Sequence, residues 1–333
     1  MKSTVLVVGG AGYIGSHMVK MLGGEGHRVV SFDNLCTGHR DAVLSGPLFE
    51  GDVLDTAALR QVFSEHAVDI VMHFAAFCYV GESVVAPQKY YRNNVVGTLN
   101  LLDAMVAANV GKLVFSSTCA TYGVPNTDTL DETHPQWPVN PYGRTKLTIE
   151  QAIGDYAAAY ALNSVSLRYF NAAGCDAEGK LGERHEPETH LIPLVLREAL
   201  RVRGGGDPAA TGLRVLGGDF DTPDGTCIRD YVHVEDLCRA HLAAATRLAS
   251  GLVGGAEAYN LGTGCGVSVK EVIAACSAAT GIDIRYRIAG RRPGDPPKLV
   301  ANAARAARVL GWSPRYAEIE SIVATAWNYM LNR

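Results

Sequence analysis

A tyrosine and a lysine spaced four residues apart are the residues of this chain best suited to acid–base chemistry. Tyr142 and Lys146 lie just after Asn140 and Pro141. Asparagine is a favourable helix N-cap and proline suits the first helical turn, so a helix is expected to begin here. Side chains four residues apart share one helix face, with Cβ atoms roughly 5–6 Å apart. The phenol and the ammonium group can therefore converge on one bound molecule.

The pair also suggests how the phenol would become a base. A phenol ordinarily titrates near ~10, which is too high for a base at neutral pH. A nearby ammonium group favours the phenolate and lowers the pKa toward the working range. The spacing thus predicts that Tyr142 is a general base activated by Lys146. Such a short pattern also occurs by chance on solvent-facing helices, so the rest of the chain must decide.

A glycine-rich turn near the N-terminus predicts a dinucleotide-binding site. Residues 4–8 form an apolar run typical of a buried parallel strand, and Gly9, Gly12 and Gly15 follow it directly. A helical pattern begins at once after this turn. Glycines let the backbone approach a pyrophosphate, and the helix N-terminus offers free N–H groups and a positive dipole end. The strand–turn–helix context makes the pattern specific.

An acidic residue follows the next apolar run at the spacing that a dinucleotide site requires. Asp33 ends the run 28–32 and lies about 20 residues beyond the glycines, where it can bind the adenosine ribose hydroxyls. No arginine follows directly to meet a 2′-phosphate, which favours NAD over NADP. Asp52, after a strand-like segment at 47–50, is placed to meet adenine. The alternative for Asp33 is that it only caps a loop.

Strands and helices alternate through the first half of the chain. Further strands are predicted at residues 69–76, 112–115 and 163–169, and a long helix at 87–109. This alternation predicts a doubly wound parallel α/β sheet of the Rossmann type. His73 lies inside an apolar run, which indicates a core histidine. Ser116 and Thr118, at the carboxyl end of a parallel strand, would point toward a ligand.

The pattern changes after Phe170. Residues 171–190 are rich in glycine and charge and are predicted to form a substrate-binding loop. Beyond it, helices are predicted at 191–203, 234–248, 269–280, 301–310 and 317–331, and strands at 213–216, 258–261 and 282–288. We expect an NAD-binding Rossmann domain of residues 1–170 plus a return segment near 229–262. A smaller C-terminal α/β substrate domain would comprise residues 171–228 and 263–333.

Composition narrows the class of protein. The 333 residues are 47% hydrophobic and 19% charged with a net charge of −4, which gives no case for nucleic-acid or anionic-membrane binding. The apolar runs are too short to span a bilayer, and the start of the chain shows no signal peptide. The eight cysteines include no Cys-x-x-Cys pair. We therefore expect reduced thiols in a cytoplasmic protein, with no zinc or other metal site and no disulfide framework.

The glycine turn, Asp33, the Ser-Ser-Thr strand end and the Tyr142/Lys146 pair together resemble the extended short-chain dehydrogenase/reductase family. Within that family, several further blocks are similar to the UDP-glucose (UDP-galactose) 4-epimerases. These blocks are residues 80–83, 93–98, 169–171, 188–193, 224–226, 229–234 and 291–295. They occur in the right order along essentially the whole chain.

The resemblance implies an NAD-dependent isomerase that inverts C4 of a UDP-hexose through a transient 4-keto sugar. Tyr142 would take the proton of the 4-hydroxyl, Thr118 would bind the same hydroxyl, and Lys146 would hold the nicotinamide ribose. The implied NAD site comprises Gly9, Gly12, Tyr13, Ile14, Gly15, Asp33, Asn34, Asp52, Val53, Phe74, Ala75, Ala76, Asn94, Ser116, Tyr142, Lys146 and Tyr169. The implied UDP-sugar site comprises Thr118, Tyr142, Asn171, His190, Leu191, Arg229, Arg292 and Asp295. A homodimer through the 87–109 helix and the helix after Pro141 is also implied.

Three positions depart from the family pattern. Cys78 stands where the family often has a lysine near the NAD phosphates, and His190 stands where many members carry asparagine. Leu299 occupies a position that is a bulky tyrosine in some members and small in others. We hypothesise that Leu299 leaves intermediate space for a 2-acetamido group on the sugar.

Three alternative functions use the same motifs to different degrees. An epimerase that exchanges UDP-xylose and UDP-arabinose would need the same catalytic residues. A nucleotide-sugar 4,6-dehydratase would need an acid pair after Thr118, where Cys119 and Ala120 stand. A non-catalytic Rossmann protein that senses NAD would not need Tyr142 and Lys146 together with Thr118.

Overall fold

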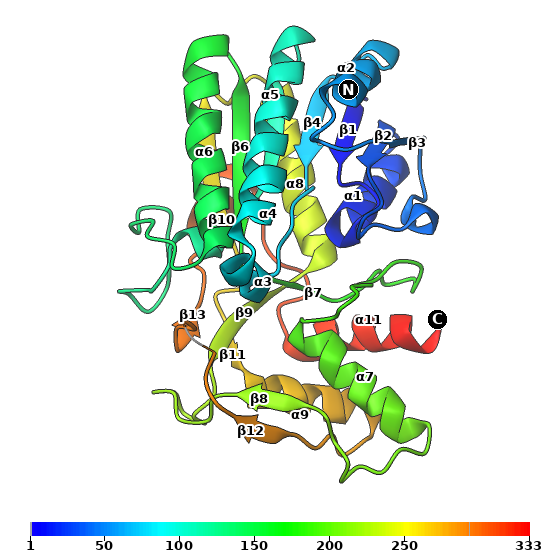
Figure 1. Cartoon of the computed structure of the whole chain (residues 1–333), viewed down its shortest axis with the longest axis vertical. Helices are drawn as coiled ribbons and strands as arrows, with labels where there is room; N and C mark the ends of the chain where they lie inside the picture. The colour runs from blue at the N-terminus through cyan, green and yellow to red at the C-terminus, as the bar shows by residue number, and fades with distance from the viewer. Residues whose placement is uncertain (1, 293) are drawn as a thin grey trace.

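The computed structural model describes residues 2–292 and 294–333, which form a larger unit and a smaller unit (Figure 1). The larger unit is built on a seven-stranded sheet in the order β10-β6-β5-β4-β1-β2-β3, in which every strand pair is parallel. The strands are β1 (Thr4–Val8), β2 (Arg28–Asp33), β3 (Leu48–Glu50), β4 (Ile70–His73), β5 (Lys112–Thr118), β6 (Asn163–Tyr169) and β10 (Ala256–Leu261). The order from β3 to β6 is that of a Rossmann sheet, which confirms the predicted fold class.

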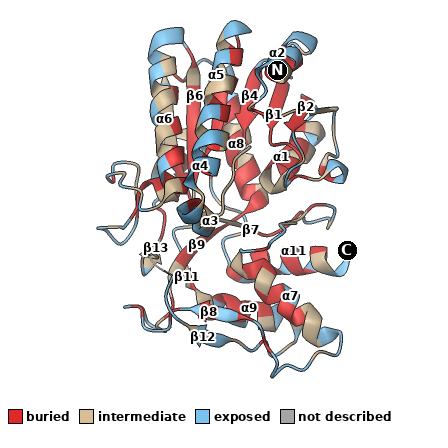
Figure 2. Cartoon of the chain, in the orientation of Figure 1, coloured by how far each residue is buried: buried red, intermediate tan, exposed pale blue. Residues whose placement is uncertain are grey.

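Helices cover both faces of this sheet, because alternate residues of each strand point to opposite sides. Val5 and Val7 of β1 pack in one core with α1 and α8, whereas Leu6 and Val8 pack in a second core with α2, α5 and α6. The helices of this unit are α1 (Tyr13–Gly24), α2 (Thr56–Glu65), α3 (Val80–Val85), α4 (Pro87–Tyr90), α5 (Gly97–Ala107), α6 (Pro141–Tyr160), α8 (Val234–Ala249) and α10 (Ala304–Leu310). The inner strands β1, β4 and β5 are therefore buried on both faces, as Figure 2 shows.

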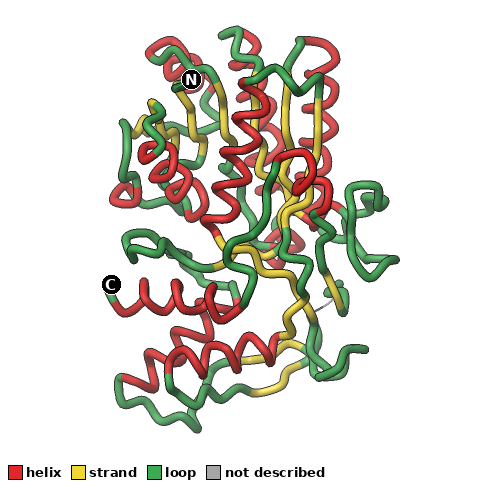
Figure 3. The backbone as a smooth tube through the Cα atoms, turned by 180° about the vertical axis from the view of Figure 1, so that it is seen from behind, coloured by secondary structure: helices red, strands yellow, loops and turns green. Residues whose placement is uncertain are grey.

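In the part of the chain that the structure describes, the smaller unit contains two short sheets and three helices. Strand β9 (Ile228–His233) pairs with β7 (Asn171–Ala173), β11 (Gly266–Ser268) and β13 (Lys298–Leu299). A separate pair joins β8 (Arg214–Leu216) to β12 (Arg287–Ala289), and the helices are α7 (Leu191–Arg203), α9 (Val269–Thr280) and α11 (Ile319–Leu331). The view from behind shows these helices and strands lying beneath the larger sheet (Figure 3).

Local signals fix the start of the helix that carries the tyrosine–lysine pair. The side chain of Asn140 accepts a hydrogen bond from the backbone N–H of Gly143 at 2.8 Å, and Pro141 occupies the first helical turn. Both features confirm the prediction from the sequence. Helix α6 then runs to Tyr160, so Tyr142 and Lys146 lie in its first two turns.

The predicted helix over 87–109 is interrupted. Helix α4 ends at Tyr90, a π-helical segment η2 follows over Tyr91–Val96, and α5 begins at Gly97. The buried side chain of Asn94 lies in this π segment and binds the backbone of Phe77. Wider π turns of this kind are frequent at functional sites. A local sequence pattern cannot show the tertiary contact that Asn94 makes.

The predicted strands of the second half are the least accurate. The strand expected at 282–288 is reduced to β12, and β7 lies inside the segment predicted to be a loop. Strands β9 and β13 were not predicted. Strand β9 buries the charged residues Arg229 and Asp230, which conceals its apolar character in the sequence. Among the described residues, each helix is too short or too polar to cross a bilayer.

Candidate active site

The glycine turn lies where β1 ends, beside the segment that follows β4. Gly9 has φ +86°, and a Cβ atom there would lie 2.6 Å from the backbone nitrogen of Ala75. A Cβ on Gly15 would lie 2.0 Å from the carbonyl oxygen of Gly9. Only glycine fits either position. The strand order reverses between β1 and β4, which is the point where ligands bind in open α/β sheets.

The first turn of α1 is open to an anionic ligand. Its N-cap is Gly12, which has no side chain to accept hydrogen bonds from the following N–H groups. Such free N–H groups at a helix N-terminus bind phosphate readily. Tyr13 donates its hydroxyl to the carbonyl of Gly174 at 2.6 Å, which ties the turn to the smaller unit. Gly12, Tyr13 and Ile14 thus lie at the N-terminus of α1, and their contact with a cofactor stays a prediction.

Asp33, Asn34 and Asp52 gather at the carboxyl ends of β2 and β3. The Asp33 carboxylate accepts backbone hydrogen bonds from Ala11 at 2.9 Å and Leu35 at 2.8 Å. The side-chain amide of Asn34 donates to Asp52 at 2.8 Å. Burial raises the pKa of Asp33 above its ordinary value. These residues form one polar corner whose carboxylate oxygens can still accept hydrogen bonds from sugar hydroxyls.

Lys146 is buried beneath the end of β5. Its Nζ atom donates to the carbonyl of Ser116 at 2.8 Å and lies 4.7 Å from the centre of the Phe115 ring. Only 3% of the residue is exposed, and burial lowers its pKa to about 8. Thr118 ends β5 and contacts the phenol of Tyr142. The structure therefore brings the three predicted catalytic side chains together.

The pKa of Tyr142 differs from the sequence-based expectation. Burial raises it well above the ordinary value of a phenol, and the contact with Thr118 opposes this only in part. Lys146 is not among the main causes of this shift, and its ammonium group donates a hydrogen bond to the Ser116 carbonyl. In the protein alone the phenol is therefore protonated, and its activation by Lys146 stays a prediction.

The segment after β4 is held by contacts from a distance. The side chain of Asn94 accepts from the N–H of Phe77 at 2.9 Å and donates to its carbonyl at 3.0 Å. Phe74 packs against the ring of His241, and the Nε2 atom of His241 lies 2.9 Å from the Ser116 hydroxyl. These contacts place Phe74, Ala75 and Ala76 next to the glycine turn. Asn94 therefore positions this segment.

His73 is a core residue, as predicted. Its Nε2 atom lies 2.9 Å from the hydroxyl of Thr98, and the side chain is buried. Burial lowers its pKa to about 3, so the ring is neutral at physiological pH.

Tyr169 ends β6, and its side chain makes a hydrogen bond with Ser116 beside the predicted catalytic residues.

The predicted diphosphate-binding residues lie in the smaller unit. Arg229 is buried on β9, where it donates to the carbonyls of Ile228 at 2.8 Å and Pro296 at 2.9 Å. Arg292 forms a two-point contact with Asp295, at 3.0 and 2.8 Å, while 48% of its side chain remains exposed. Asp295 lies 3.7 Å from the Arg229 guanidinium. Two cations and one anion therefore share this position.

Asn171 and Leu191 begin the elements that lead into this region. Asn171 starts β7, which pairs with β9 in parallel, and Leu191 starts α7. His190 is the N-cap residue of α7, but its side chain contacts Glu183. Val53 is buried behind the polar corner and packs in the core of the larger unit. A role for these residues in binding stays a prediction, and the His190 side chain is engaged by Glu183.

One buried residue that positions the site, Asp230, was not predicted from the sequence. Asp230 is fully buried beside Arg229 and accepts backbone hydrogen bonds from Thr263 at 2.8 Å, Gly264 at 3.0 Å and Ala301 at 3.1 Å. Burial raises its pKa above the ordinary value. The signal available in the sequence was an acid next to the predicted phosphate-binding arginine, within an otherwise apolar run. Asp230 holds the loops that flank Arg229 in place.

Known proteins share this arrangement. Residues 5–262 match the model of the NAD dependent epimerase/dehydratase family. A protein of Rhizobium leguminosarum bv. trifolii named UDP-glucose 4-epimerase is 51% identical over 326 residues, which cover 98% of this chain and 97% of that protein.

Two solved structures superpose closely on this chain. The structure of UDP-glucose 4-epimerase from Brucella ovis in complex with NAD is 50% identical, with a TM-score of 0.91, and the match covers 98% of this chain and 97% of that one. A UDP-glucose-4-epimerase from Stenotrophomonas maltophila with bound NAD and formylated UDP-arabinopyranose is 37% identical, with a TM-score of 0.92 over 99% and 98% of the two chains. The chain belongs to the NAD dependent epimerase/dehydratase family.

Proposed function

We propose that this protein is an NAD-dependent epimerase that interconverts UDP-glucose and UDP-galactose through a transient 4-keto sugar. The observation that carries the proposal is the buried group formed by Tyr142, Thr118 and Lys146 at the end of β5, close to the glycine turn. The relatives named UDP-glucose 4-epimerase, which match nearly the whole chain, support it.

The residues at the carboxyl ends of β1 to β5 fit NAD. The glycine turn leaves space for a pyrophosphate against the N-terminus of α1, and Asp33 with Asn34 and Asp52 suits the adenosine. Bound NAD would supply a positively charged ring that accepts a hydride from C4 of the sugar and returns it. We propose that the larger unit, which includes a return segment from α8 to β10, holds NAD. The smaller unit, which includes β9 with Arg229, would hold the UDP-sugar.

Tyr142 would move the proton of the sugar 4-hydroxyl. Burial alone keeps the phenol protonated, so a cation next to the hydroxyl is required to favour the phenolate. Lys146, with a pKa of about 8, is largely cationic at neutral pH and is placed to hold a ribose hydroxyl from beneath β5. Thr118 would bind the same sugar hydroxyl. Tyr142 then returns the proton after the sugar has presented its other face.

Inversion at C4 requires a sugar that turns while its nucleotide stays fixed. Arg229 and Arg292 would bind the diphosphate, because guanidinium groups pair with phosphate oxygens at two points. Near Thr118, the surroundings are less polar: Leu299 packs against the cluster that includes Cys119 and Phe170. Firm contacts to the diphosphate and few polar contacts to the hexose meet this requirement.

The quaternary structure and location are part of the proposal. Tyr91, Val96 and Tyr160 are exposed on the η2 and α6 segments, and these elements lie against each other. Such apolar side chains on adjoining helices support the homodimer that the family resemblance implies.

The eight cysteines are all free thiols, which supports a cytoplasmic location.

The first experiment is mass spectrometry of the denatured purified protein, followed by a panel of UDP-sugars. We expect NAD to be released in about equal amount to the chain, and UDP-galactose to be converted to UDP-glucose. Turnover of UDP-xylose and UDP-arabinose alone would favour the pentose epimerase. NAD release with no turnover of any UDP-sugar would favour the NAD-sensing protein and contradict the proposal.

A further inference from the structure

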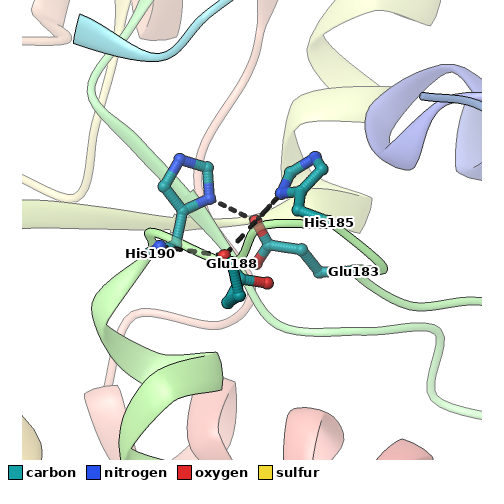
Figure 4. Close-up of side chains that lie close together, drawn as sticks. All are labelled: Glu183, His185, Glu188 and His190. Carbon is teal, nitrogen blue, oxygen red and sulfur yellow. Dashed lines mark hydrogen bonds and ion pairs between the residues drawn. The ribbon is translucent and has the colours of Figure 1, made fainter. Parts of the chain in front are cut away.

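Four side chains between β7 and the first turn of α7 converge on one point, and the proposed reaction does not use them as a set. They are Glu183, His185, Glu188 and His190 (Figure 4), hereafter the His–Glu cluster. One donor atom from each lies within 4.8 Å of the other three. We propose that the His–Glu cluster binds one divalent transition-metal ion of the Zn²⁺ class. This inference goes beyond the proposed epimerase activity and does not depend on it.

The donor atoms are close enough together to share one four-coordinate ion once the direct contact between His190 and Glu183 opens. Ligands about 2.0–2.2 Å from a tetrahedral Zn²⁺ lie roughly 3.3–3.5 Å from one another. The Nδ1 atom of His185 lies 3.0 Å from Glu183 Oε1 and 3.8 Å from Glu188 Oε1. The Nδ1 atom of His190 contacts the same Glu183 oxygen. Both imidazole rings and both carboxylates thus face one small space, as Figure 4 shows.

Unpaired buried atoms give independent support for a ligand. The Glu188 side chain is fully buried, and its Oε1 atom accepts backbone hydrogen bonds from Thr189 and His190 at 2.8 and 2.9 Å. Its Oε2 atom has no hydrogen-bond partner, and Nδ1 of His185 makes no hydrogen bond of good geometry, although the Glu183 carboxylate lies 3.0 Å away. The guanidinium of Arg197 lies 3.9 Å from Glu188 Oε2. Buried polar atoms are rarely left without partners, and a cation at the centre of the cluster would satisfy both.

The donor set indicates the class of metal. Two imidazoles with two carboxylates suit zinc and its neighbours in the first transition row, whereas Mg²⁺ and Ca²⁺ prefer oxygen donors alone. The two carboxylates balance the charge of one dication. The cysteine spacing speaks against zinc sites built from thiolates. It says nothing about a site built from imidazoles and carboxylates. The His190 side chain is 41% exposed, which leaves a path for the ion to enter.

Metal binding at this position would stiffen the wall of the nucleotide site. The His185 ring packs edge-on against Tyr13, with ring centres 6.3 Å apart, and against Tyr79 at 5.9 Å. Tyr13 opens α1 directly after the glycine turn. One ion would therefore join the loop after β7, the N-terminus of α7 and the region of the glycine turn. We assign the site a structural role, with no step of the reaction passing through it.

The test uses the untagged full chain after treatment with a chelator. Competition against a chromophoric chelator is expected to find one tight Zn²⁺ site per chain. Glu188→Gln should weaken Zn²⁺ binding at least about tenfold, the lower limit for losing even an outer contact of a metal site. Glu186→Gln is the matched control, because Glu186 is exposed on the same loop and lies outside the His–Glu cluster. It should leave the affinity unchanged.

X-ray absorption at the zinc edge of the wild-type protein decides the question even if Glu188→Gln fails to fold. The proposal predicts a first shell of nitrogen and oxygen with the scattering pattern of two imidazoles. A shell containing sulfur would place the ion on exposed thiols such as Cys36 or Cys265 and overturn the proposal. Failure to find a tight site, or equal affinity in the two glutamate variants, would also overturn it and show that the cluster is an ion-paired network.

Discussion

The two ends of the proposed site are built differently. At the end of β5, Tyr142 and Lys146 are buried, and burial is the main cause of the shifts in their pKa values. In the smaller unit, Arg229 and Arg292 share the single carboxylate of Asp295, and Arg292 remains half exposed. The first end fixes groups in a dry position suited to proton transfer. The second holds charges that can exchange partners when a diphosphate arrives. Substitutions at the buried end should therefore lower kcat, whereas substitutions at the charged end should raise KM.

The largest effect is expected at the buried end. Tyr142→Phe removes the proposed proton acceptor, and general acid–base catalysis contributes about 10²–10⁴-fold, so kcat should fall by roughly that factor. NAD binding should persist, because the glycine turn is untouched. Steady-state assays with UDP-galactose and mass spectrometry of released NAD measure the two quantities.

Tyr160→Phe provides the control for this variant. Tyr160 lies on the same helix but is exposed, so its loss should leave kcat unchanged. Activity of Tyr142→Phe within a few-fold of wild type would remove the proposed base from the account.

The charged end should show a binding defect. Arg292→Gln removes a charge-assisted contact to the diphosphate, and such contacts are worth about 1.5–3 kcal/mol, or roughly 10- to 100-fold in KM. The value of kcat should change little, because the contact is the same before and during the reaction. Arg291→Gln is the matched control, since Arg291 pairs with Asp219 instead. A fall in kcat with unchanged KM for Arg292→Gln would break the distinction between the two ends.

A smaller effect is expected between the two ends, at Leu299. Leu299 lies opposite Arg229 in the β9–β13 register and packs beside Cys119. We expect the wild type to turn over UDP-N-acetylgalactosamine more slowly than UDP-galactose. Leu299→Ala should raise that relative rate and Leu299→Tyr should lower it, each by about tenfold, as for other changes of pocket volume. The absence of any turnover of the acetamido sugar by wild type would contradict the hypothesis of intermediate space.

The smallest effect concerns stability and pH. Burial lowers the pKa of Lys146 from 10.5 to about 8, so the unfolded chain binds more protons than the folded chain between these values. The stabilising contribution is therefore complete above pH 10.5 and is lost as the pH falls through 8. Denaturant unfolding of wild type and Lys146→Met should show wild type gaining stability relative to the variant from pH 8 to 10. A pH-independent difference would show that Lys146 is not perturbed.

The larger unit and the helices of the smaller unit could be predicted from local signals, whereas most of the short strands of the smaller unit could not. Helix α6 was predicted from Asn140 and Pro141, and β1 from an uninterrupted apolar run before Gly9. Strand β9 escaped prediction because the burial of Asp230 depends on backbone donors of Thr263 and Ala301, far away in the chain. Contacts between segments that are far apart in the chain leave no periodic pattern of apolar residues in the sequence.

The site residues, too, could be predicted where they lie close together on one helix and could not where an irregular loop brings them together. Tyr142 and Lys146 are neighbours on one helix, so their spacing predicts their meeting. The irregular loop that brings Glu183 and His185 to His190 follows neither the helical nor the strand period. Spacing does not reveal that burial raises the pKa of the Tyr142 phenol.

The most direct test of the central claim follows the hydrogen at C4. UDP-galactose deuterated at C4 is incubated with the purified protein in ordinary water, and the UDP-glucose formed is analysed by NMR. The account predicts that the deuterium stays at C4 of the product, because the same nicotinamide accepts and returns it while Tyr142 handles only the hydroxyl proton. Replacement of the deuterium by solvent hydrogen would contradict the account.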